Sequence, residues 1–100
     1  MKTCRVLLIG RRLSVLEPLA AALSREGIEA DFTQDAAGAS LRFSANYYDL
    51  IAFGRGIDPK ERARLRMEFS WQNPEVRYAV GIAPVVPLLV GQIKNALRKN

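Results

Sequence analysis

The sequence of 100 residues contains no histidine and a single cysteine, Cys4. Without histidine, the chain cannot build a Ser-His-Asp or Cys-His catalytic set, and the common zinc sites lose a usual ligand. One cysteine allows neither an internal disulfide nor a cysteine metal cluster, which is typical of a reducing compartment. The sequence therefore predicts a cytoplasmic protein that holds no metal or cofactor and is not an enzyme.

Long apolar runs are also absent. The run over residues 6–9 is too short for a membrane span of roughly 18–20 residues, or for the ~7–15-residue core of a signal peptide. We therefore expect no membrane association. Hydrophobic residues still make up 49% of the chain and charged residues 25%, as in an ordinary globular protein. We expect a single domain over residues 1–100.

Basic residues exceed acidic residues, and the net charge is +5. This excess favours anionic partners. The densest basic group lies in a predicted helix and consists of Lys60, Arg62, Arg64 and Arg66. Residues two apart on a helix do not face one another, and a nucleic-acid surface needs a continuous basic stripe with interleaved aromatic residues. We therefore predict a solvated charged face and no nucleic-acid partner.

Apolar runs alternate with helix-like segments along the chain. The continuous runs over 6–9 and 50–53 indicate strands buried on both faces. Alternating patterns over 28–33 and 78–82 indicate half-exposed strands, and their inward-facing residues are predicted to be Ile28, Ala30, Phe32, Tyr78, Val80 and Ile82. Helices are expected over 14–25, over 35–46 with Asp35 as cap, over 58–72, and from Pro87 onward.

Two of these helices carry recognisable start signals. Ser14 and Glu17 have the spacing of a capping box, and Pro18 would then fall in the first turn. Asp58 and Pro59 form a stronger signal, an N-cap followed by proline at the first helical position. These signals place one helix after each continuous apolar strand.

Four strand–helix units in succession predict an α/β fold with a four-stranded parallel sheet and helices on both faces, a three-layer sandwich. Strands buried on both faces belong in the middle of the sheet and half-exposed strands belong at its edges. The sheet order 2-1-3-4 satisfies both conditions. In this order the ligand crevice of such folds lies above the ends of strands 1 and 3.

Three segments in the first half of the chain resemble a response-regulator receiver domain. Residues 5–9 are similar to the family's first strand, residues 33–39 to its second-strand exit and following helix, and residues 48–53 to the strand before the phosphoacceptor. The resemblance implies a flavodoxin-like fold and a role in signalling. The chain is one strand–helix unit shorter than the family's usual five.

The residues through which receivers accept a phosphoryl group have no counterpart in this chain. The family's acidic pair falls on Gly10 and Arg11, and its phosphoacceptor aspartate falls on Gly54. Its hydroxyl residue falls at 81–82, and its conserved lysine falls on Ala83. Phosphoryl transfer would need a carboxylate nucleophile and further carboxylates around Mg²⁺. The resemblance therefore implies a pseudo-receiver that cannot be phosphorylated.

Arginines follow both central strands at these positions. Arg11 and Arg12 follow the first strand and Arg55 follows the second, beside helix N-termini whose free amides attract anions. This arrangement predicts a site for a phosphate, a nucleotide or a partner's carboxylate. In the alternative interpretation these arginines are solvated, or they pair with Asp35, Asp49 and Asp58.

The last helix contains more apolar residues than one buried stripe requires. A candidate interface consists of Val85, Val86, Leu88, Leu89 and Ile93. In the alternative interpretation all of them are buried under the sheet. The sequence thus favours a non-catalytic signalling or protein-interaction module, with a protein partner or a second copy bound through the last helix. The competing function is a small anion- or nucleotide-binding sensor that uses the arginine crevice.

Overall fold

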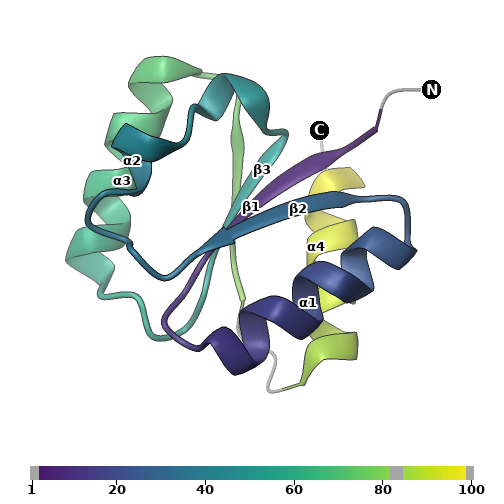
Figure 1. The fold of residues 1–100 in the computed structure, drawn as a ribbon. Coiled ribbons are helices and arrows are strands. Elements are labelled where there is room, and N and C mark those ends of the chain that lie inside the picture. Colours follow the sequence, from purple (N-terminus) through teal and green to yellow (C-terminus); the bar gives the residue numbers. More distant parts are fainter. Residues whose placement is uncertain (1–2, 82–84, 99–100) are drawn as a thin grey trace.

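A parallel sheet forms the middle layer of the protein (Figure 1). The computed structural model describes residues 3–81 and 85–98. Within them, the strands are β1 (Arg5–Ile9), β2 (Glu29–Thr33), β3 (Leu50–Phe53) and β4 (Arg77–Val80). Their order is β2-β1-β3-β4 and each neighbouring pair is parallel. The predicted α/β class and the sheet order 2-1-3-4 are confirmed.

Helices cover both faces of the sheet, so the predicted three layers are present. One face carries α1 (Leu13–Arg25) and α4 (Val86–Arg98). The other face carries α2 (Ala39–Arg42), a 3-10 turn η1 (Ala45–Tyr47) and α3 (Pro59–Gln72) (Figure 1). Alternate residues of the central strands enter two separate cores, since side chains alternate across a strand. Leu7 and Phe53 pack toward α3, whereas Leu8 and Ala52 pack toward α1 and α4.

The two helix-start signals have different outcomes. Asp58 caps α3 as predicted, because its Oδ1 accepts a hydrogen bond from the Lys60 amide at 2.8 Å. The capping box at Ser14 is wrong. α1 begins one residue earlier, after Arg12, with no side-chain cap. Pro18 therefore lies inside the helix rather than in its first turn, and it cannot donate a hydrogen bond to the Ser14 carbonyl.

The helix predicted over 35–46 is wrong in its length. The α-helix there has only four residues, and the η1 turn follows it. Asp35 does not cap it, because its carboxylate accepts from the Gly38 amide in the preceding turn. The Gln72 side chain of α3 then bonds to the Ala45 amide at 2.6 Å and to the Ser40 carbonyl at 3.0 Å. Backbone groups that would continue the helix are thus satisfied from α3.

The edge strands depart from strict alternation at their carboxyl ends. Phe32 and Val80, predicted to face inward and be covered, are exposed, because no neighbouring side chain covers an edge strand on its outer side. Thr33, predicted to face outward, is buried on the opposite face, where its hydroxyl accepts from the Asp35 amide at 3.0 Å. The predictions for Ile82 and Ala83 lie outside the described residues. None of the helices in the described part of the chain has the length and apolarity needed to cross a membrane.

Candidate functional site

Three neighbouring strands are each followed by glycine at the carboxyl edge of the sheet: Gly10 after β1, Gly54 after β3 and Gly81 after β4. The strand ladder continues through them, because the Gly54 and Gly81 amides donate to the carbonyls of Ile9 and Phe53, both at 2.8 Å. The residues two positions earlier in each strand pack toward α1 and α4. Side chains at the three glycines would point the same way. We call these residues the glycine row.

The missing side chains leave a crevice of about 610 Å³ at this edge. A Cβ atom at Gly10 would lie 3.1 Å from Leu16, and one at Gly81 would lie 2.9 Å from Leu89. A Cβ at Gly54 would have only backbone atoms within 4 Å. The space over Gly54 is therefore open, with a wall from α1 on one side and a wall from α4 on the other. The volume is that of a small-molecule site.

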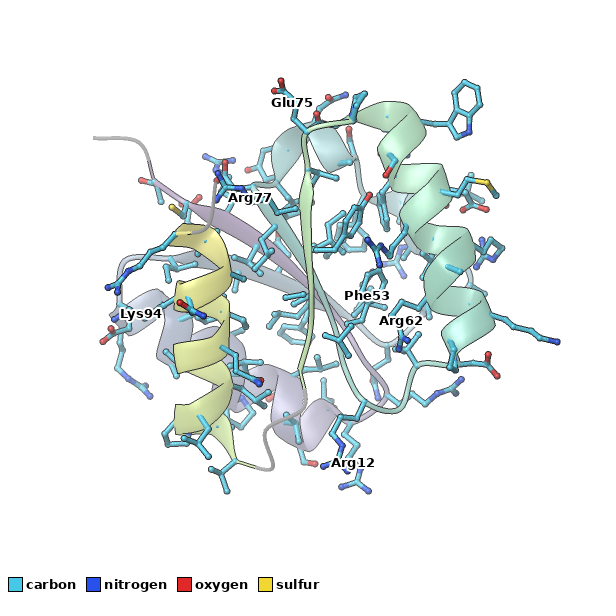
Figure 2. All side chains as sticks on the ribbon, turned by 180° about the vertical axis from the view of Figure 1, so that it is seen from behind. Arg12, Phe53, Arg62, Glu75, Arg77 and Lys94 are labelled. Atoms are coloured by element: carbon cyan, nitrogen blue, oxygen red, sulfur yellow. The ribbon has the colours of Figure 1, made fainter. Side chains whose placement is uncertain are left out.

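The predicted arginines lie together at the rim of this crevice, which is lined in part by Arg11, Arg12 and Arg55. The Arg11 Nε donates to the Gly56 carbonyl at 2.6 Å and so joins the start of α1 to the loop after β3. Arg12 projects from this edge into solvent (Figure 2). Across residues 3–81 and 85–98, neither Arg12 nor Arg55 has a hydrogen-bond or ion-pair partner for its side chain.

The alternative pairing with three aspartates is not observed. Asp35 Oδ2 lies 3.9 Å from Arg42 Nη1, and Asp58 caps α3. Asp49 accepts from the Arg5 amide at 2.9 Å, at the opposite edge of the sheet. The first turn of α1 also contains no acidic residue. No carboxylate of the three aspartates therefore neutralises the positive charge of the rim.

A divalent cation has no comparable place in the described residues, where no group of three or more cysteine or acidic side chains is close enough to hold a metal. At the carboxyl edge lie Gly10, Arg11 and Gly54, the positions onto which the sequence resemblance places the receiver carboxylates. The side chains of these three residues offer neither a carboxylate nucleophile nor a metal ligand.

The five residues of the candidate interface differ in how far they are exposed to solvent. Leu89 and Ile93 belong to the core under the sheet, with Leu89 only 8% exposed, and Val86 packs against the same core. Leu89 and Ile93 are therefore unavailable to a partner and Val86 is only partly accessible, because helical spacing turns them toward the sheet. Val85 and Leu88 are exposed, the latter by 57%.

The exposed side of α4 continues beyond the two apolar residues. Val85, Leu88, Gly91 and Asn95 are all exposed and follow one another at helical spacing. We call this stripe the α4 outer face. A Cβ atom at Gly91 would have no neighbour within 4 Å. Nothing in the described residues therefore requires a glycine in the middle of this helix.

Three features of the structure were not predicted from the sequence. Gly81 repeats the pattern of an apolar residue followed by glycine that ends β1 and β3, and this repeated pattern could have revealed the whole row. Gly91 interrupts a predicted helix, which was also visible. No sequence signal indicated the hydrogen bond from the Tyr48 hydroxyl to Asp31 Oδ2 at 2.7 Å. Burial and this hydrogen bond raise the pKa of Tyr48 well above its usual range.

Comparison with known proteins shows the fold. No protein-family model matches the chain, and no curated protein matches it. Among solved structures, the chain is similar to HP1043, described as an orphan response regulator of H. pylori. The TM-score is 0.68 at 18% sequence identity, and the match covers 96% of this chain and 98% of that one. The chain thus has a receiver-like, flavodoxin-like fold.

Proposed function

We propose that this protein is a non-catalytic signalling module of receiver-like fold that is not phosphorylated and that binds a second copy of itself through the α4 outer face. A cytoplasmic setting, expected from the single cysteine, belongs to the same proposal. The receiver-like fold supports the signalling role, since folds of this kind are shared by response regulators. The absence of carboxylates at Gly10, Arg11 and Gly54 supports the loss of phosphorylation.

The observation that carries the self-association is Gly91. A glycine in a helix interior costs roughly 0.8–1 kcal/mol relative to alanine. No contact within the described part of the chain offsets this loss of stability, because a Cβ atom at Gly91 would have no neighbour within 4 Å. Small residues let a second helix approach closely, and Val85 and Leu88 would supply the apolar contact beside it. Two copies related by a twofold axis would each present the same face.

We expect the molar mass of the protein, measured by sedimentation equilibrium over a concentration series, to rise toward that of a dimer. Leu88→Glu should weaken self-association at least tenfold, because a carboxylate would be buried against an apolar face. Gly91→Ala should have opposite effects on two measurements. It should raise the stability of the monomer by about 0.5–1 kcal/mol through helix propensity, and it should weaken the dimer through the added methyl group.

Met67→Glu is the matched control, since Met67 is an exposed apolar residue on α3, on the other side of the sheet. This variant should associate like the wild type. A protein that stays monomeric at the highest concentration, or equal association of the Leu88→Glu variant and the wild type, would contradict the proposal.

We expect no phosphoryl adduct on the wild-type protein after incubation with acetyl phosphate and Mg²⁺, as measured by intact-mass spectrometry. Gly54→Asp should also remain unmodified, although it restores a carboxylate at the acceptor position. Gly10 and Arg11 still provide no ligand for Mg²⁺ in that variant, and Arg11 repels the cation. A base-labile adduct on the wild type would show that the module accepts phosphate.

A further inference from the structure

We infer that the crevice over the glycine row binds a small amphipathic anion. The apolar body of this ligand lies between α1 and α4 over Gly54, and its single carboxylate or phosphate group lies at Arg12 and Arg55. This site is separate from the α4 outer face, so the inference does not depend on self-association.

Apart from the three arginines and Gln92, the described residues that line the crevice are apolar or glycine. Its floor is the sheet, where Ala52 and Ala79 are small and the glycine row has no side chains. Its walls are leucine and isoleucine side chains of the two helices, among them Leu16 and Leu89. Such a slot favours an aliphatic or aromatic body, because apolar surface gains free energy in proportion to the area it removes from water.

Among the described residues that line the crevice, the charged ones are Arg11, Arg12 and Arg55, which form its rim. Arg11 is held by the Gly56 carbonyl and fixes the loop that carries Arg55. Arg12 and Arg55 are left as donors to a ligand, and guanidinium groups bind carboxylate and phosphate oxygens with paired hydrogen bonds. A site with one positively charged end and one apolar slot fits a ligand that has one anionic group and one apolar body.

A purely ionic ligand fits this crevice less well. The rim arginines are exposed to water, where salt screens their attraction for phosphate. A nucleotide would use several backbone amides of one glycine-rich loop, whereas these glycines come from three separate strands whose amides donate to neighbouring carbonyls. The apolar slot must therefore supply most of the binding, and the arginines select an anion.

Decanoate is a suitable probe, with decanol as the neutral match and acetate as the head group alone. We expect calorimetry at low ionic strength to give a decanoate affinity at least tenfold tighter than that of decanol or acetate. Amide NMR shifts should move at Gly10, Gly54 and Gly81. An Arg12→Gln/Arg55→Gln variant should lose at least tenfold in decanoate affinity while decanol binding stays within about twofold.

Two further variants separate the crevice from general charge and from folding. Gly54→Leu should reduce decanoate affinity at least tenfold by filling the slot, and the smaller Gly54→Ala should reduce it less. An alanine there meets only ordinary contacts, so this variant stays folded. The Arg25→Gln/Arg98→Gln variant removes the same amount of charge from the C-terminal ends of α1 and α4, which lie away from the crevice. It should bind decanoate like the wild type. Equal affinity for decanol and decanoate would overturn the inference, as would unchanged decanoate binding in both Gly54 variants.

Discussion

Replacing Phe69 by alanine should lower the free energy of unfolding by about 3–5 kcal/mol. Phe69 is fully buried and packs α3 against the sheet, in the core that also contains Phe53. Truncation removes apolar contact and leaves a cavity that the surrounding structure fills only in part. Since domains of this size are stable by about 5–15 kcal/mol, the variant should be close to unfolded in water. Urea titration followed by circular dichroism measures the change.

Trp71 is the matched control, because it is an aromatic residue two positions further along the same helix. It is 85% exposed, whereas Phe69 is 0% exposed. Trp71→Ala should therefore change stability by no more than about 0.5 kcal/mol. A loss for Trp71→Ala as large as that for Phe69→Ala would mean that the outer face of α3 is covered in solution.

The protein should lose stability steeply in alkali because of Tyr48. The Tyr48 side chain is largely buried and its hydroxyl donates to Asp31, so burial and this hydrogen bond raise the pKa of Tyr48 in the folded state above its ordinary value. In the unfolded chain tyrosine ionises near pH 10. Above that pH the unfolded state binds fewer protons than the folded state, so stability falls as pH rises. The slope for one such group approaches about 1.4 kcal/mol per pH unit.

Urea unfolding measured from about pH 9 to about pH 11 tests this expectation, because that range spans the ordinary tyrosine pKa of about 10. Tyr48→Phe should be less stable than the wild type near neutral pH, by about 1 kcal/mol for the lost hydrogen bond. Its stability should fall less with pH, so the two curves should converge in alkali. Tyr47→Phe is the control, because Tyr47 is exposed, and it should keep the wild-type slope. Parallel curves for Tyr48→Phe and the wild type would contradict the assignment.

The sheet order was predictable from the sequence because short stretches of consecutive residues indicate which strands are central. The residues of β1 and β3 are apolar without interruption, and a strand of that kind has to lie between two others. Asp58 and Pro59 fix the start of α3 by themselves, since the N-cap bond joins residues two apart. The start of α1 was not predictable in the same way. It follows Arg12, whose side chain provides no cap, so no local signal marks this start.

The candidate site was predictable only in part. Parallel strands bring their carboxyl ends together, and this rule placed Gly10 and Gly54 with the arginines. The division between Leu88 and Leu89 depends instead on how α4 is rotated. Packing of Leu89 and Ile93 into the core under the sheet sets that rotation. Two contacts with residues far away in the sequence agree with it: Lys94 pairs with Glu26 at the end of α1 at 2.6 Å, and Arg77 donates to the Leu97 carbonyl. Sequence spacing alone gives a stripe on a helix but not the direction in which it faces.

The order of strands in the sheet has a consequence for how the chain is made. β1 lies inside the sheet, although it precedes the other three strands in the sequence, and Val6 pairs with Leu50, which is 44 residues later (50 − 6). At a synthesis rate of about 5–20 residues per second, β1 waits roughly 2–9 s for this neighbour. During that interval the backbone edge of β1 that later pairs with β3 stays open, and the two apolar faces of this strand are not yet covered by α3 and α4.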